Sequence, residues 1–303
     1  MNKALATALR QTESVIVGKQ RQIRLSLTCL LAQGHLLIED VPGVGKTTLA
    51  HVLARVLGLD YNRIQFTSDM LPSDILGGSL LQGQGQLKFI KGPVFTNIVL
   101  ADEINRAPPR SQSALLEAME EHQVSMEGQT HILPKPFFVI ATQNPREQLG
   151  TFPLPESQLD RFHMRIQMGY PDEAAERQLL AGGKRRKSLS DIEPCLSAQT
   201  LLTLQEEVEQ VHVSEPLLDY LQQLLKFTRD SKRFEVGLSP RAGLALRHCA
   251  QAWAYLHDRD HVLPEDVQTV LPYVVDHRLV SAASGQEGSD KNVPSQLSCI
   301  AIP

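Results

Sequence analysis

The stretch HLLIEDVPGVGKTTLAHVLARVLG, His35 to Gly58, decides how this chain folds. A short apolar run is followed by a glycine-containing turn and then by a helical pattern that ends at Gly58. The turn matches the phosphate-binding pattern G-x-x-x-x-G-K-[ST] except at its first position, where Asp40 replaces glycine. A strand, a loop and a helix in this order predict that backbone N–H groups at the helix N-terminus hold the phosphates of a nucleotide.

Each residue type in the loop has a predicted task. Gly43 and Gly45 lie where the backbone must approach phosphate oxygens and adopt positive φ, which favours residues without a Cβ. Lys46 can reach the β- and γ-phosphates, and the Thr47 hydroxyl can ligate Mg²⁺. The predicted nucleotide-binding residues are Pro42, Gly43, Val44, Gly45, Lys46, Thr47 and Thr48.

Asp40 is the one departure from the pattern. The first position lies where the strand leaves the sheet, and aspartate is among the few residues that tolerate left-handed backbone geometry. We therefore expect Asp40 to alter the entry of the loop and to leave its grip on phosphate intact.

Working outward, short runs rich in β-forming residues alternate with helical patterns, which predicts an α/β fold with a mostly parallel sheet covered on both faces. A helix is expected at Thr47–Leu57, with Gly58 just beyond its C-terminus. The predicted strands are His35–Glu39, Asn62–Phe66, Ile98–Ala101, Phe137–Ala141 and His163–Met168.

The C-terminal third is predicted to be helical. Four amphipathic patterns begin near Ser197, Ser214, Ser239 and Leu263, with serine, proline or acidic residues at their N-termini. The expected organisation is a nucleotide-binding core at 1–185, a linker at 186–196, an all-helical lid at 197–280 and a disordered, Ser/Gly-rich tail at 281–303.

The composition narrows the class of protein. A net charge of −4 offers no cationic field for nucleic acid, which is therefore an unlikely partner. The four cysteines are scattered, as expected for reduced thiols rather than a disulfide or zinc framework. Because no signal peptide or bilayer-length apolar run is evident, we expect a cytoplasmic protein without membrane insertion.

Two acidic residues follow the third apolar strand, in NIVLADEINRAPP. Asp102 is predicted to hold Mg²⁺ through water, and Glu103 to polarise the attacking water as a general base. A buried strand followed by a solvated acidic turn would read the same way by itself, but the phosphate-binding loop favours the catalytic interpretation.

Two further polar residues complete the predicted site. Asn144, after FFVIAT, could orient the water against the γ-phosphate together with Gln143, although Asn-Pro is also an ordinary turn. Arg161, in LPESQLDRF, is either a surface ion pair with Asp160 or an arginine finger donated to a neighbouring subunit.

Together these elements resemble the AAA+ ATPases and, more narrowly, the MoxR family in the helix-2-insert branch. The resemblance covers about Val15 to Val280. Its specific carriers are LPSDILGG (71–78), GPVF (92–95), DEINRAPPRSQSALLEAMEE (102–121), ATQNP (141–145) and LPESQLDRF (154–162).

The resemblance implies a five-stranded parallel P-loop αβα core, a C-terminal helical lid, ATP and Mg²⁺ as ligands, and a homo-oligomeric ring, usually hexameric. It assigns Asn144 as sensor 1, Arg161 as the finger and Arg241, in LSPRAGLAL, as sensor 2, without deciding which subunit's nucleotide Arg241 reads. Val17 and Gly18, in VIVGKQ, resemble the segment that frames adenine, although an ordinary apolar loop fits almost as well.

Two inserted β-hairpins are expected at Gly77–Lys91, with its glycine–glutamine turn, and at Gln123–Pro136. Both carry few Lys or Arg, unlike DNA-gripping loops. The leading hypothesis is an ATPase ring that remodels or matures a client protein, one candidate client being a protein with a von Willebrand factor A domain. The alternatives are a DNA motor and a nucleotide-gated scaffold with little hydrolysis.

Overall fold

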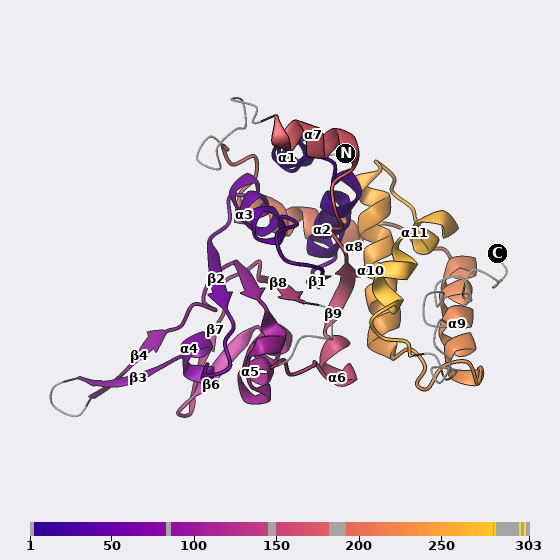
Figure 1. The fold of residues 1–303 in the computed structure, drawn as a ribbon. Helices are drawn as coiled ribbons and strands as arrows, with labels where there is room; N and C mark the ends of the chain where they lie inside the picture. The colour runs from indigo at the N-terminus through magenta and orange to yellow at the C-terminus, as the bar shows by residue number, and fades with distance from the viewer. Residues whose placement is uncertain are drawn as a thin grey trace.

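The computed structural model describes residues 3–82, 86–144, 150–181, 192–280, 282, 297 and 300. Within them, five strands form a parallel sheet in the order β2-β5-β8-β1-β9, so the predicted core is confirmed (Figure 1). The predicted strand ends differ from the observed ones by at most two residues. The strands are β1 (His35–Glu39), β2 (Tyr61–Gln65), β5 (Ile98–Asp102), β8 (Phe138–Gln143) and β9 (Phe162–Ile166).

Alternating side chains of the central strands β1, β5 and β8 enter two separate apolar clusters. In β1, Leu36 and Ile38 belong to one cluster, and Leu37 belongs to the other. A parallel sheet needs both faces covered, because its crossover helices lie on both sides. The first face is covered by α1 (Lys3–Val15), α2 (Gln20–Leu31) and α3 (Lys46–Val56), and the second by α5 (Pro109–Glu121).

The helical C-terminal region packs on the sheet at the β9 side (Figure 1). It shares the first apolar cluster with α1, α2 and α3 rather than having a core of its own. Gln205 donates a hydrogen bond to the buried Leu30 carbonyl, 2.7 Å away. Its helices are α8 (Ala198–Glu209), α9 (Glu215–Asp230), α10 (Pro240–Leu256) and α11 (Pro264–Val275).

A polar staple joins this region to the start of β9. The Arg278 guanidinium, 4% exposed, donates from Nε to Asp160 Oδ1 at 2.7 Å and from Nη2 to the Phe162 carbonyl at 2.7 Å. Ser239, the N-cap of α10, donates to the other Asp160 oxygen at 2.8 Å. The segment that contains Arg161 is therefore held between the sheet and two parts of the helical region.

Both predicted hairpins are present and project from the same side of the sheet (Figure 1). His131 of the second stacks on Phe89 of the first, with ring centroids 3.9 Å apart, so the hairpins contact each other. The hairpin strands are β3 (Gly77–Gln82), β4 (Gln86–Lys91), β6 (Gln123–Met126) and β7 (Gln129–Ile132). The short helices are α4 (Pro72–Leu76), η1 (Ile104–Arg106), α6 (Glu156–Leu159) and α7 (Glu173–Leu180).

Some predictions fall mainly outside the described residues. These are the turn of the first hairpin, most of the linker at 186–196 and most of the tail at 281–303. Within the tail, Leu297 is described, and it is buried in the first apolar cluster. Among the described residues, no helix is both long and apolar enough to cross a bilayer.

Removing the Arg278 staple should destabilise the fold. In Arg278→Ala, Asp160 loses its buried partner, and we expect the free energy of unfolding in urea to fall by about 3–5 kcal/mol. Arg177→Ala, at an exposed position of α7, is the control and should change stability by less than about 0.5 kcal/mol. A loss below about 1 kcal/mol for Arg278→Ala would contradict the staple.

The stability of the fold should also decrease as the pH is lowered, because of His35. Burial lowers the pKa of His35 to about 4; Nδ1 accepts from the Val139 N–H at 3.1 Å, and Nε2 lies 3.2 Å from the Met119 carbonyl. Between pH 6.5 and 4 the unfolded chain binds a proton here that the folded chain does not, which costs about 3 kcal/mol of stability. Urea unfolding of wild type and His35→Asn across this range should give a shallower pH slope for the variant. Parallel slopes would exclude His35 as the source.

Candidate nucleotide site

The predicted phosphate-binding loop has the backbone that its glycines require. Gly43 and Gly45 have φ of 85° and 96°, in the left-handed region. A Cβ built on either would meet nothing within 4 Å, so the loop encloses an open cradle rather than a packed turn. Gly45 is the N-cap of α3, whose first N–H groups need acceptors, as a phosphate would supply.

Lys46 is the first residue of α3, and its side chain reaches back to the entry of the loop. Its Nζ donates to the Asp40 carbonyl at 2.6 Å and to the Val41 carbonyl at 3.3 Å. Burial lowers the Lys46 pKa, whereas the carboxylates of Asp40, Asp102 and Glu103 act in the opposite direction. The lysine is thus held among groups that favour its charged form, beside the cradle.

The loop, the acidic pair and Asn144 line one cavity of about 340 Å³. This volume is within the range of small-molecule sites. Because β1, β5 and β8 are parallel, the segments that follow them meet at one edge of the sheet. The lining residues are Pro42, Gly43, Gly45, Lys46, Thr47, Thr48, Arg63, Gln65, Asp102, Glu103 and Asn144.

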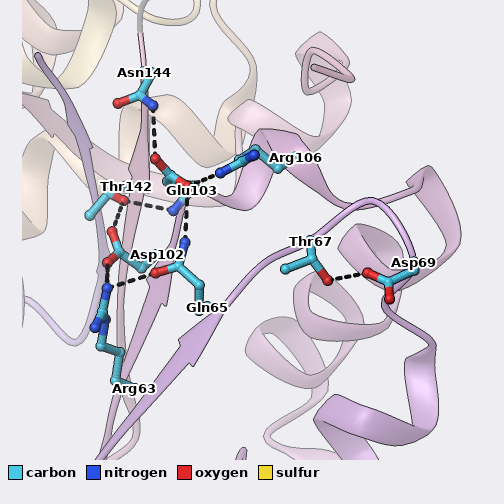
Figure 2. A network of polar contacts seen from close by, with 9 residues as sticks. All are labelled: Arg63, Gln65, Thr67, Asp69, Asp102, Glu103, Arg106, Thr142 and Asn144. Atoms are coloured by element: carbon cyan, nitrogen blue, oxygen red, sulfur yellow. Dashed lines mark hydrogen bonds and ion pairs between the residues drawn. The ribbon is translucent and has the colours of Figure 1, made fainter. Parts of the chain in front are cut away.

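Both carboxylate oxygens of Asp102 have partners (Figure 2). Oδ1 accepts from the Thr142 hydroxyl at 2.6 Å. Oδ2 accepts from Arg63 Nη2 at 2.6 Å and from its Nε at 3.0 Å. Arg63 therefore balances the charge of the carboxylate that is predicted to hold the metal.

Glu103 is fixed by three side chains (Figure 2). Oε1 accepts from Asn144 Nδ2 at 3.0 Å, and Oε2 accepts from Gln65 Nε2 at 2.9 Å and Arg106 Nη1 at 2.8 Å. Its own φ of 57° is unusual for a residue with a side chain, and its N–H donates to the Thr142 hydroxyl at 2.9 Å. Strained backbone of this kind is found preferentially at functional sites.

The sequence interpretation missed four members of this network: Arg63, Gln65, Arg106 and Thr142. Arg63 and Gln65 lie two residues apart in β2, on one face of the strand, and both line the cavity. Their alternation in RIQF was the available signal, but only pairing of β2 with β5 brings them to the acidic pair.

The donor set fits a magnesium ion that is bound jointly by the protein and the phosphates of a nucleotide. Thr47 and Asp102 line the same cavity, as a shared ion would need. Across the described residues, no cluster of three or more acidic, histidine or cysteine side chains could hold a metal. Mg²⁺ is commonly held by one or two carboxylates together with substrate phosphates and water, and this set matches that pattern.

Comparison with known proteins agrees with this geometry. The model of the ATPase family associated with various cellular activities (AAA) matches residues 35–164, and an AAA lid domain model matches residues 226–297. The chain is 41% identical to "Chaperone MoxR1" of Mycobacterium tuberculosis, over 91% of this chain and 75% of the relative. It belongs to the MoxR family of AAA+ ATPases.

Two further proteins are similar over nearly their full length. The "Uncharacterized protein YeaC" of Bacillus subtilis is 44% identical, over 92% of this chain and 88% of that one. A crystal structure of a "putative ATPase" from Cytophaga hutchinsonii superposes with a TM-score of 0.89 at 36% identity, covering 98% and 94% of the two chains.

Two predicted residues of this MoxR-family chain lie away from the cavity. Arg161 precedes β9 and is therefore at the amino edge of the sheet, roughly 15 Å from the phosphate-loop edge for strands of this length. Arg241, in the first turn of α10, forms an ion pair with Glu120 at 2.6 Å, as Arg161 does at 2.9 Å. Neither arginine lines the cavity of its own chain.

The predicted adenine segment contacts α7 and the connection between β9 and α7. A Cβ on Gly18 would lie 2.7 Å from that of Ala175, and Lys19 Nζ donates to the Tyr170 carbonyl at 2.7 Å. Val17 and Gly18 are not among the cavity-lining residues, and the Val44 side chain packs against the first apolar cluster.

Asp40 has a role that the pattern did not predict. Its φ is not positive, so the left-handed geometry considered for it is not used. Instead, Oδ1 accepts from the Val41 N–H at 2.8 Å, and Oδ2 accepts from the Gly169 N–H at 2.6 Å. The carboxylate ties the loop entry to the connection between β9 and α7.

Asp40→Gly should affect stability more than nucleotide binding. Loss of the charged hydrogen bond to Gly169 should lower the free energy of unfolding by about 1.5–3 kcal/mol, measured in urea. The affinity for a fluorescent ATP analogue should change by less than about tenfold, because the Lys46 contact uses the Asp40 backbone. Asp40→Asn keeps one acceptor oxygen, so its free energy of unfolding should lie between those of wild type and Asp40→Gly. A loss of binding above about 100-fold in a folded Asp40→Gly variant would contradict this role.

Proposed function

We propose that this chain hydrolyses ATP with Mg²⁺ as part of a homo-oligomeric ring, for which we expect six subunits. The hydrolysis cycle of this ring remodels or matures a client protein. The observation that carries the proposal is the convergence on one cavity of a phosphate-binding loop and the Glu103 carboxylate. Glu103 lies 3.0 Å from the Asn144 amide, which supports roles as general base and water-orienting group.

In this proposal the cavity residues divide the work. Gly43, Gly45 and the α3 N-terminus bind the phosphates, and Lys46 balances the charge of the β- and γ-phosphates. Glu103 orients and polarises the attacking water. A magnesium ion held by Thr47 and Asp102 would supply charge neutralisation on the phosphates.

Arginines of a neighbouring subunit provide the remaining contacts to the terminal phosphate in this proposal. Arg161 lies at the opposite edge of the sheet from the cavity of its own chain, which supports a role as a finger in trans. Arg241 shares a carboxylate partner with Arg161, which supports action on the same neighbouring nucleotide rather than on its own. A head-to-tail interface that closes into a ring provides this geometry.

The client is proposed to be a protein, by analogy with the relative named a chaperone. A protein with a von Willebrand factor A domain is the candidate client class. The alternatives, a DNA motor and a scaffold with little hydrolysis, have less support. The net charge of −4 disfavours a DNA motor. The contact between Glu103 and Asn144 within the cavity disfavours a scaffold with little hydrolysis.

Mixing two inactive variants should restore ATP hydrolysis. Glu103→Gln removes the base, and Arg161→Ala removes the finger, which we expect to lower kcat by about 10³-fold or more. In a one-to-one mixture about a quarter of the subunit interfaces combine an intact base with an intact finger. Phosphate release should therefore recover to about that fraction of wild type.

Controls separate the alternatives. The Arg161→Ala protein mixed with Lys46→Ala should recover activity in the same way, because Lys46 belongs to the cavity side of the interface. No recovery in mixtures shown to co-assemble would count against the shared site. Stimulation by single-stranded DNA with a steep salt dependence would favour the DNA motor, and absence of turnover at any subunit concentration would favour the scaffold.

A further inference from the structure

Two guanidinium groups meet on one carboxylate at the amino edge of the sheet. Arg161 Nη2 lies 2.9 Å from Glu120 Oε2, and Arg241 Nη2 lies 2.6 Å from Glu120 Oε1. Each carboxylate oxygen therefore receives one arginine. The three residues come from the last turn of α5, the connection before β9 and the first turn of α10.

The backbones that carry these arginines are fixed independently. Asp160, next to Arg161, accepts from Arg278 and from Ser239, the N-cap of the helix that carries Arg241. Arg161 Nη1 also donates to the Leu116 carbonyl of α5 at 2.5 Å. Because both chain segments are anchored, the remaining freedom is in the two long side chains, which Glu120 restricts.

The cluster has a surplus of positive charge and spare hydrogen-bond donors. Two guanidiniums face one carboxylate, and the side chains of Arg161, Arg241 and Glu120 are 28%, 41% and 33% exposed. A guanidinium has five N–H donors, and the contacts described use two nitrogens of Arg161 and one of Arg241. Both can therefore contact an anion without leaving Glu120.

We propose that Glu120 is a positioning residue that holds Arg161 and Arg241 side by side as a two-arginine clamp for the terminal phosphate of the nucleotide on the neighbouring subunit. This inference rests on the shared site of the proposed function. Arginine side chains lose much rotamer freedom when they order, and the carboxylate imposes most of that loss before the subunits meet. Misplacement of such groups lowers the rate of the chemical step more than it lowers substrate binding.

Glu120→Gln tests the proposal with nearly unchanged shape. The amide keeps one acceptor oxygen but loses the charge, so one arginine is released. We expect kcat for ATP to fall by about 10–100-fold, with KM within about threefold of wild type. Glu120→Asp keeps the charge but moves it away from the arginines, so its kcat should lie between those of wild type and Glu120→Gln.

The matched controls are Glu117→Gln and Glu121→Gln, exposed positions of the same helix with the same change in charge. Both should keep wild-type kcat. Equal losses in all three variants would overturn the proposal, because a general effect of charge would explain them. A higher kcat in Glu120→Gln would also overturn it, since Glu120 would then restrain the arginines rather than present them.

Mixing separates this role from a structural one. Glu120→Gln subunits keep an intact cavity, so mixture with Glu103→Gln subunits should restore activity, whereas mixture with Arg161→Ala subunits should not. If Arg161→Ala with Glu103→Gln recovers and Glu120→Gln with Glu103→Gln does not, the role of Glu120 fails and the shared site stands. If neither recovers in co-assembled mixtures, the shared site itself fails.

Discussion

The parallel alignment of β1, β5 and β8 is the constraint from which the site follows. Parallel strands end at the same edge of a sheet, so the phosphate-binding loop, the Asp102–Glu103 pair and Asn144 converge although they are distant in sequence. The alignment requires apolar cover on both faces. Two separate clusters provide it, one with α3 and the C-terminal helices and one with α5.

The same alignment separates the two halves of the proposed chemistry. Groups that follow strands reach the cavity, whereas Arg161, which precedes β9, lies at the other edge. Glu120 lies near that edge because α5 runs back from the end of β5. The neighbouring Met119 carbonyl contacts His35, the first residue of β1, which places this end of α5 at the amino edge of the sheet. In the proposed function, a subunit arranged in this way holds a nucleotide at one edge of the sheet and presents arginines to its neighbour at the other edge.

The polar groups around the cavity form a network that is largely satisfied before any ligand binds. Arg63 and Thr142 occupy Asp102, while Gln65, Arg106 and Asn144 occupy Glu103. Partly buried carboxylates are costly unless paired, and these partners offset that cost while fixing the side chains. The Asp40 carboxylate extends the network to Gly169, beyond the loop that it begins.

The sequence alone determined the elements whose signals are local. These include the loop with its positive-φ glycines, the α3 helix with Gly58 just beyond its C-terminus, the strand that leads to Asp102, and the serine-capped C-terminal helices. Tertiary structure decided the partners. Gln65 lies opposite Asp102 only through the register of β2 with β5, and Glu120 meets Arg161 and Arg241 only because α5, β9 and α10 pack together. Backbone conformation depends on neighbours in sequence, whereas register and packing depend on the order of strands in the sheet, which no short stretch encodes.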